Sequence, residues 1–196
     1  MSTRPRIQQK NNKLGTRVLV SALLIVVAAI AITFATNYLK KPIAQDPAMP
    51  EGLTKAEVLW VSDGDTIVCK FIDDVPDEVA QYIDSVESNS PGEYYMRLIG
   101  YDAPESVHPD ESKNTEEGRL ASEFVKSKLQ GKQVNLEFDT QIKDKYNRLL
   151  VYVWLDGALF NKTVLEEGHG ELLNIPPNEK YEYVFEEAYT QKGKED

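Results

Sequence analysis

Three carboxylates and one arginine stand where predicted strands meet turns, and their types suit the binding of a hard cation. Asp65 lies in the turn of a predicted hairpin, while Asp102 and Glu105 closely follow a predicted strand that carries Arg97. Carboxylate oxygens bind Ca²⁺, Mg²⁺ or Mn²⁺ in preference to zinc. Taken singly, each acid also fits an ordinary turn or a solvated loop, and the arginine also fits a strand face that reaches water.

The rest of the composition narrows the metal chemistry further. A single cysteine, Cys69, excludes an intrachain disulfide framework and a zinc site built from several cysteines. Two histidines, His108 and His169, leave little for a histidine-rich site. With 32 acidic residues against 22 basic ones, carboxylates are the abundant class of ligand.

The elements expected to position these residues are short strands and helices. Two β-branched runs, Ala56–Ser62 and Ile67–Phe71, are separated by Asp63-Gly64-Asp65-Thr66, which predicts a hairpin. The other predicted strands are Tyr94–Ile99, Val134–Phe138 and Leu149–Leu155. Apolar residues at helical spacing predict helices over Glu116–Leu129, from about Asn161 to Gly168, and over Glu179–Gln191.

Five short strands interleaved with three helices, without alternating parallel βαβ units, predict an α+β domain. A small barrel with helical decoration accounts for this pattern, and the OB-fold is the commonest such plan. We expect Asn161 to cap the second helix at its start. Residues 73–92 are acidic and polar, and we expect them to form an exposed insertion before the third strand.

Charge is distributed unevenly along the chain. Seven of the 22 basic residues lie in the first 41 positions, which contain no acidic residue, so residues 42–196 keep 15 basic against 32 acidic residues, a formal charge of −17. An acidic domain binds a polyanion weakly unless its positive groups gather in one cleft.

The N-terminal part has the pattern of a membrane anchor. Residues 18–35 are uncharged and apolar, and as a helix they would span roughly 27 Å, close to the thickness of a bilayer core. Five basic residues precede this run and two follow it, so residues 1–17 are predicted to form a cytoplasmic tail. Residues 36–53 would be a linker, and residues 54–196 a domain outside the cytoplasm. The alternatives are secretion after cleavage near Ala35, and a buried core helix.

Three motifs in this order resemble the thermonuclease family, whose best-known members are staphylococcal-nuclease-like. They are Asp63-Gly64-Asp65-Thr66, the segment from Arg97 to Glu105, and Asp144-Lys145-Tyr146-Asn147-Arg148. The resemblance covers most of residues 56–191. It implies an OB-fold with three helices and Ca²⁺-dependent hydrolysis of phosphodiester bonds in DNA and RNA.

The resemblance also implies roles for individual residues. Asp65 and Asp102 match the family's calcium carboxylates, with the backbone carbonyl of Ala103 as a further ligand. Glu105 matches the glutamate that activates or orients the attacking water. Arg97 and Arg148 match the two arginines that bind the scissile phosphate.

The physical chemistry of phosphodiester cleavage agrees with these roles. The reaction passes through a five-coordinate phosphorus with additional negative charge, so fixed cations must stand where that charge grows. Arginine suits this task because it donates two parallel hydrogen bonds and keeps its proton. A carboxylate beside a dication is a weak base, so Glu105 either orients the water or takes its proton, and His108 is an alternative base.

The residues expected to surround the substrate differ from the family pattern at two positions. Where well-known members place two tyrosines that pack around the substrate, this chain has Asn174 and Pro176. Tyr146 and Lys145 remain as candidate substrate-binding residues, although a tyrosine half-buried in the barrel is an equal alternative. We expect any positive strip to be formed by lysines at 126, 128, 143 and 145 together with the two arginines.

Three functions compete at this point. The first is a membrane-tethered nuclease that faces outward, requires Ca²⁺ and cleaves DNA or RNA. The second is a module on the same fold that binds nucleic acid or protein without cutting it. The third is a purely structural membrane protein, which would leave the five predicted site residues unexplained.

Overall fold

The chain is represented by a computed structural model that describes residues 26–28, 46–88, 90–107 and 109–192. It divides into two units, residues 1–43 and residues 44–196. In the first unit, residues 26–28 are helical, and the rest of the predicted anchor over residues 18–35 lies outside the described residues. Within the described ranges, no helix is both long enough and apolar enough to cross a bilayer.

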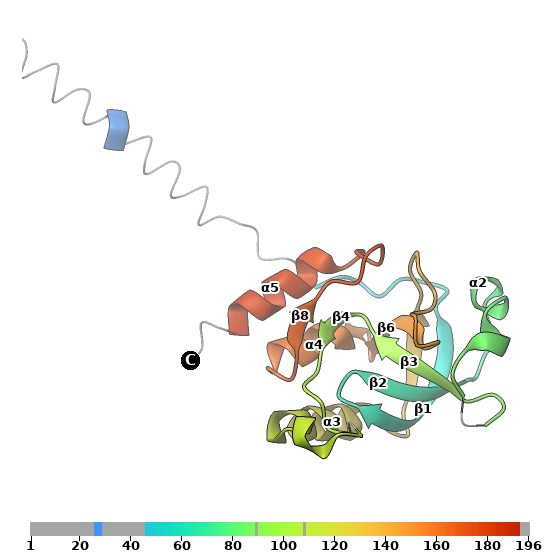
Figure 1. Ribbon diagram of the computed structural model, residues 1–196. Coiled ribbons are helices and arrows are strands. Elements are labelled where there is room, and N and C mark those ends of the chain that lie inside the picture. Colours follow the sequence, from blue (N-terminus) through green and yellow to red (C-terminus); the bar gives the residue numbers. More distant parts are fainter. Residues whose placement is uncertain (1–25, 29–45, 89, 108, 193–196) are drawn as a thin grey trace, which may run out of the picture. The chain divides into compact units, whose positions relative to one another are not determined.

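Five strands of the second unit close into a barrel (Figure 1). They run in the order β3-β2-β1-β5-β6, and β3 also pairs in parallel with β6, which joins the two edges. The strands are β1 (Thr54–Asp63), β2 (Thr66–Phe71), β3 (Tyr94–Leu98), β5 (Gln133–Glu137) and β6 (Leu149–Leu155). Together with the helices around it, this five-stranded closed barrel confirms the predicted α+β OB-fold.

The helices and the β4–β8 pair lie outside the barrel sheet, and the short strand β7 pairs with β6 at the edge of that sheet. The long helices are α3 (Glu116–Leu129), which packs on β1, α4 (Phe160–Glu166), which packs on β6, and α5 (Glu182–Lys192), which packs on α4. Short elements complete the fold: α2 (Asp77–Ala80), η1 (Ile83–Ser85), β4 (Gly100–Asp102), η2 (Glu111–Lys113), β7 (Ala158–Leu159) and β8 (Glu171–Leu173). The prediction for the helix over 116–129 is confirmed, and Thr115 caps it by accepting a hydrogen bond from the Gly118 N–H.

The strand predicted over 94–99 ends one residue earlier, because the chain turns sharply out of the barrel at Gly100. This glycine has a φ of +101°, and a Cβ there would stand 2.3 Å from the ring of Phe185. Only glycine fits both the backbone conformation and the space. The turn sends β4 away from the barrel to pair with β8, and it carries Asp102 toward solvent.

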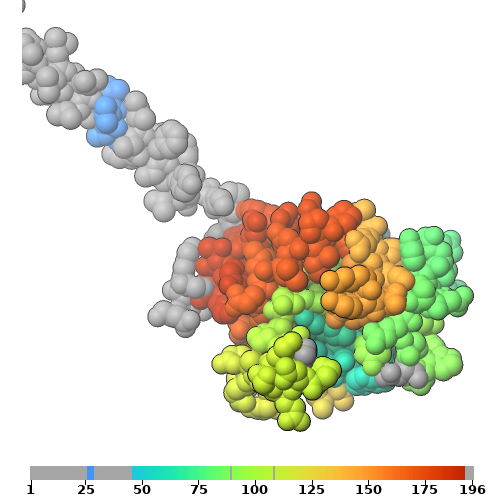
Figure 2. All heavy atoms as spheres, viewed as in Figure 1, coloured from blue at the N-terminus to red at the C-terminus, as the bar shows by residue number. Residues whose placement is uncertain are grey.

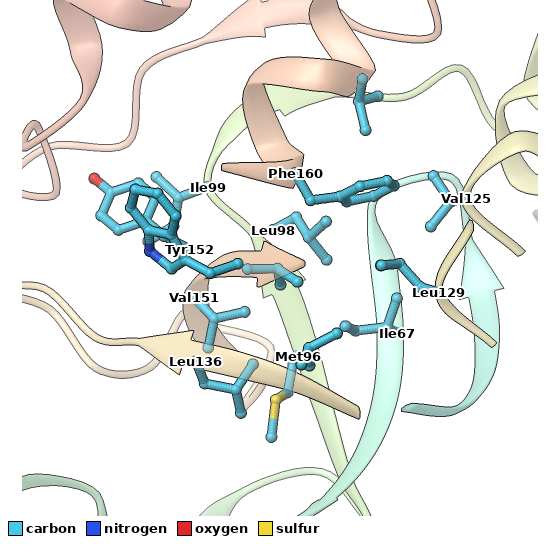
Figure 3. Packing of buried hydrophobic residues seen from close by; sticks show 14 of the residues in the cluster. Ile67, Met96, Leu98, Ile99, Val125, Leu129, Leu136, Val151, Tyr152 and Phe160 are labelled. Carbon is cyan, nitrogen blue, oxygen red and sulfur yellow. The ribbon is translucent and has the colours of Figure 1, made fainter. Parts of the chain in front are cut away.

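The core is continuous between the barrel and its helices. In β6, the residues from Leu149 to Trp154 are all buried, because α4 packs on this strand and the barrel interior lies on its other face. Figure 3 shows Ile67 and Met96 from the strands in one cluster with Val125 of α3 and Phe160 of α4. This core holds the strand ends that carry the candidate site in fixed positions.

The capping role predicted for Asn161 is wrong. Leu159 is the N-cap of α4, and Asn161 is fully buried. Its amide donates to the carbonyl oxygens of Ile99 and Val151 at 2.8 and 3.2 Å, and its Oδ1 accepts from the Val153 N–H at 2.8 Å. Buried backbone groups where β3 ends need such partners, so this side chain joins α4 to the barrel.

Two segments expected to be exposed or extended make contacts with the domain. In the predicted linker, Asp46 forms an ion pair with Lys162, and Leu53 packs against the core. In the acidic stretch between β2 and β3, Val79 and Val86 are buried. Most of the described residues of this stretch are exposed, as expected for an insertion, whereas these two apolar side chains are buried and join it to the core.

Candidate active site

Arg97 stands between the two carboxylates that sequence analysis assigned to a metal. Its Nη2 lies 3.1 Å from Oδ2 of Asp65 and 2.7 Å from Oδ1 of Asp102, and its Nη1 donates to the Leu98 carbonyl at 3.0 Å. The residue is only 4% exposed, which rules out a strand arginine on a solvated face. A buried guanidinium is stable here because it pairs with two carboxylates and donates hydrogen bonds to Asp102 and to the Leu98 carbonyl.

The hairpin between β1 and β2 holds Asp65 in place. Its Oδ1 accepts from the hydroxyl of Thr66 at 2.7 Å, and its Oδ2 accepts from the backbone N–H of Ala103 at 3.3 Å. Its carbonyl also accepts from the Leu98 N–H at 2.9 Å. The carboxylate therefore joins the hairpin, β3 and the segment after β4.

Asp102 differs from Asp65 in exposure, since 62% of its side chain is accessible against 12% for Asp65. Partial desolvation raises the pKa of Asp102 above its usual range, and the negative charge of Asp65 adds to the increase. The guanidinium of Arg97 opposes both effects. Two close carboxylates of this kind favour a nearby cation, and one of them remains open to solvent.

Arg148 reaches the same group of side chains from the loop between β5 and β6. Its Nη1 donates to the hydroxyl of Thr66 at 2.9 Å, and Thr66 in turn donates to Asp65. Five side chains thus form a continuous network, which we call the site network: Arg148, Thr66, Asp65, Arg97 and Asp102.

Asp144 and Thr66 are functional candidates to which sequence analysis gave no separate role. Oδ1 of Asp144 accepts from the backbone N–H groups of Tyr146 and Arg148, both at 2.9 Å. Its Oδ2 accepts from Nε of Arg148 at 2.9 Å and lies 2.8 Å from Nη2. An aspartate that begins a turn four residues before an arginine was the available signal.

The site network borders a cleft of about 410 Å³. Tyr146 is 61% exposed at its edge, and Nζ of Lys145 and Cζ of Arg148 stand 4.9 and 5.4 Å from the centre of its ring. It is therefore an exposed aromatic side chain and not a half-buried barrel residue. The cleft is lined by Arg97, Asp102, Gln141, Asp144, Lys145, Tyr146, Arg148, Leu150, Leu173, Ile175 and Pro176.

The two positions that replace the family tyrosines have different surroundings. Pro176 lines the cleft next to Ile175, whereas Asn174 donates to a carboxylate oxygen of Glu182. This wall of the cleft is therefore apolar and presents no aromatic ring. Of the predicted lysines, Lys145 lines the cleft, while Lys126 and Lys128 belong to α3 and do not line it.

The structure does not bring the Glu105 side chain into the site network. The residue is exposed, and its carboxylate makes no hydrogen bond or ion pair with any residue that the structure describes. Its backbone is fixed, because its carbonyl accepts from the Thr115 N–H at 2.9 Å and a Cβ on Gly118 would stand 2.2 Å from that oxygen. His108, the alternative base, lies outside the described residues.

The donor set suits a hard cation better than a soft one. Within the described part of the chain, no three or more histidine, cysteine, aspartate or glutamate side chains gather where they could hold a metal ion. Asp65 and Asp102 nevertheless share one guanidinium nitrogen, so both already face a single positive charge. Ca²⁺ accepts irregular shells completed by carbonyl groups and water, so two carboxylates at an open cleft fit this ion.

The family to which the chain belongs follows from a comparison with models of known protein families. The family model described as Staphylococcal nuclease homologue matches residues 95–195. The chain belongs to the staphylococcal nuclease family. It is a nuclease, an enzyme that hydrolyses phosphodiester bonds of nucleic acids. The match includes Arg97, Asp102 and Arg148 and begins beyond Asp65.

Individual proteins similar to this chain are nucleases as well. A thermonuclease from Staphylococcus hyicus is 34% identical over 179 residues, which cover 89% of this chain and 92% of the relative. A thermonuclease from Staphylococcus intermedius is 41% identical over 99 residues, 50% of this chain and 58% of the relative. Endonuclease YncB from Bacillus subtilis (strain 168) is 35% identical over 88 residues, 44% of this chain and 41% of the relative.

Proposed function

We propose that this member of the family is a calcium-dependent nuclease in which Asp65 and Asp102 hold Ca²⁺ and Arg97 and Arg148 bind the scissile phosphate. The observation that carries the proposal is the site network. It joins groups from three distant parts of the sequence at the edge of one cleft. A phosphate in this cleft would meet two fixed guanidinium groups.

The surroundings of each arginine fit this task differently. Asp144 holds two nitrogens of Arg148 and fixes the plane of the guanidinium, so little freedom is lost when a phosphate binds. Arg97 is buried and gives the neighbouring carboxylates a positive partner. When bound, Ca²⁺ supplies further positive charge beside the phosphate oxygens, with the Ala103 carbonyl as a proposed additional ligand.

Glu105 is proposed to orient or deprotonate the attacking water. Its exposed carboxylate has no protein partner among the described residues, so it is free to bind water, while its fixed backbone limits where that water can stand. Tyr146 and Lys145 are proposed to contact the nucleotide. Their exposure at the edge of the cleft supports this role.

The proposal for location rests on the sequence of residues 1–53. The apolar run over residues 18–35 and the basic residues before it support an anchor that leaves the catalytic domain outside the cytoplasm. Secretion after cleavage is the alternative. Cell fractionation with N-terminal sequencing of the mature protein separates the two, because a new N-terminus after residue 35 in the medium would contradict the anchor.

The enzymatic proposal is tested by incubating the full-length protein with single-stranded DNA, in Ca²⁺ and in chelator. We expect fragmentation that requires Ca²⁺ and is lost in Asp65→Asn and Arg148→Ala. Glu137→Gln is a matched control, because Glu137 is also a buried carboxylate but its partners, Trp154, Tyr181 and Lys180, lie outside the site network. Fragmentation that persists in the chelator would contradict the calcium site, and DNA retention without fragments would indicate a binding module.

A further inference from the structure

The acidic segment between β2 and β3, residues 73–93, has no part in the function described so far. It carries seven acidic residues and no lysine or arginine. It precedes residues 95–195, which match the family model. Val79 and Val86 anchor it to the domain, and Tyr82 and Ile83 pack against the core.

This segment contacts the loop that carries Arg148. The backbone N–H of Glu87 donates to the Asn147 carbonyl at 2.7 Å. Nζ of Lys143 donates to Oγ of Ser85 at 2.9 Å and to Oδ1 of Asn147 at 2.7 Å. In Figure 2 the green surface that includes the acidic segment lies beside the orange surface that includes the loop between β5 and β6, in agreement with these bonds.

The contacts meet at a residue with an uncommon backbone conformation. Asn147 has a φ of 66°, in the left-handed region, where asparagine is tolerated but is not at its lowest energy. Its N–H donates to the Asp144 carbonyl at 3.2 Å, and its own carbonyl is the acceptor for Glu87. Arg148 follows directly, so the dihedral angles at Asn147 set the direction in which the arginine leaves the loop.

The loop is therefore held from two sides. Asp144 holds Arg148 from within the loop, through the backbone and the guanidinium. Glu87 and Ser85 hold Asn147 and Lys143 from outside. The outer contacts are made by a segment that is itself tied to β3, since the Glu87 carbonyl accepts from the Tyr95 N–H at 3.1 Å. Two residues beyond Tyr95 lies Arg97.

We propose that the acidic segment is a brace for the active site, which fixes the turn at Asn147 and so positions Arg148 relative to Arg97 at the cleft. The proposal rests on the proposed function, because it assigns the segment to the two arginines that bind phosphate. Glu87 is a positioning residue that acts through its backbone N–H, and its carboxylate is not needed.

A pair of substitutions at one position tests the brace. Glu87→Pro removes the N–H that reaches Asn147, and Val86 already has the extended backbone (φ −78°, ψ 141°) that a following proline requires. Glu87→Ala keeps the N–H and removes the charge. We expect kcat on single-stranded DNA to fall between about 10-fold and 100-fold in the proline variant. We expect it to stay within about twofold of wild type in the alanine variant, which lacks only a surface charge. Equal effects in the two variants would overturn the brace in favour of a charge effect.

A double-mutant cycle shows whether the effect passes through Arg148. In an Arg148→Ala background, Glu87→Pro is expected to cost no further activity, because the group that it positions is absent. A full additional loss in that background would overturn the proposal. Wild-type activity in Arg148→Ala alone would instead contradict the proposed phosphate site, so the two failures are distinguishable.

Amide hydrogen exchange gives a readout that does not depend on catalysis. In Glu87→Pro we expect faster exchange at the amides of Asn147 and Arg148 than in wild type, with unchanged protection in β6. Ser85→Ala removes one acceptor of Lys143 without altering the backbone, and a smaller effect in the same direction is expected. Unchanged exchange at Asn147 in both variants would contradict the brace, whatever the activity.

Discussion

Two buried carboxylates in this barrel have opposite surroundings. Glu137, at the end of β5, is 4% exposed and accepts from Nε1 of Trp154 at 2.7 Å, from the hydroxyl of Tyr181 at 3.0 Å and from Nζ of Lys180. Asp65 is 8% exposed and belongs to the site network. The donors around Glu137 come from the core and from the chain before α5, whereas the Asp65 network ends at a cleft.

The difference shows that burial alone does not distinguish a carboxylate proposed to hold a metal ion from a structural one. The charge of Glu137 is matched by one lysine and by neutral donors, so its surroundings are complete and need no ligand. Asp65 shares its arginine with a second carboxylate, Asp102, so two negative charges meet one positive charge beside open space. That imbalance is what an added cation would correct.

The largest expected effect is a difference in nuclease activity between variants of the two carboxylates. Asp65→Asn is expected to lower kcat/KM on DNA by roughly 10³-fold, because an amide oxygen is a weak ligand for Ca²⁺ beside a developing charge. Glu137→Gln is expected to leave activity within a few-fold of wild type. Both are measured by the release of fragments from labelled DNA, and similar losses in the two variants would remove the distinction.

Lysine substitutions test whether the arginines of the site network act through the planar shape of the guanidinium as well as through its charge. Arg97→Lys and Arg148→Lys keep the charge but lose the planar group that donates in two directions, and we expect roughly 10²-fold lower kcat in each. Single-turnover kinetics at saturating Ca²⁺ measure this directly. Near-wild-type turnover in both variants would mean that neither guanidinium contacts the phosphate.

In stability we expect the opposite order, with Glu137→Gln losing more free energy of unfolding than Asp65→Asn. Glu137→Gln leaves the Trp154 or Tyr181 donor without a charged acceptor, at a cost of about 1–3 kcal/mol in the free energy of unfolding. Urea titration followed by tryptophan fluorescence measures it. Asp65→Asn is expected to cost less, because Arg97 keeps Asp102 as its partner. A more stable Glu137→Gln variant would show that the closed carboxylate is not structural.

Activity is expected to fall as the salt concentration rises, because the substrate is a polyanion. The domain is acidic overall, and only a few cations line the cleft, so we expect binding of DNA to depend on two or three phosphate contacts. Counterion release then predicts that kcat/KM falls about tenfold between about 50 and 200 mM salt. Activity that is independent of ionic strength would argue against a cleft that works by local positive charge.

The smallest effect concerns His169, whose ring stacks on Phe124 at 4.3 Å. Desolvation lowers its pKa; Lys192 adds to this, whereas Glu167 opposes it. Its neutral form is therefore favoured in the folded state, so its contribution to stability is complete above the unfolded pKa and is lost as pH falls toward the lower folded value. Relative to His169→Phe, wild type should lose stability as pH falls from 7 to 5 in urea titrations, and identical pH profiles would contradict this.

Local patterns predicted the parts of the fold that local sequence determines. The hairpin around Asp65 follows from turn residues between β-branched runs, and α3 follows from apolar residues at helical spacing. The exit of the chain at Gly100 was missed, because the reason for it is the ring of Phe185, 85 positions later. Asn161 was misassigned because its partners lie far along the chain or on a different element, at Ile99 after β3 and at Val153 in β6.

Prediction of the site was limited in the same way, because contacts between residues far apart in the sequence leave no local pattern. Residue types identified the carboxylates and arginines, and the order of the motifs linked them to the family. The link through Thr66 could not be predicted, because the bond from Arg148 spans 82 positions. Nor could the contacts of the acidic segment, since composition alone favoured exposure.

The most direct test of the metal assignment is a crystal structure of the protein with Ca²⁺ and a nucleoside phosphate, with the ion identified by anomalous scattering. We expect one Ca²⁺ at about 2.3–2.6 Å from carboxylate oxygens of both Asp65 and Asp102, with the phosphate bound by Arg97 and Arg148. A cation bound elsewhere, or a phosphate that neither arginine contacts, would contradict this expectation.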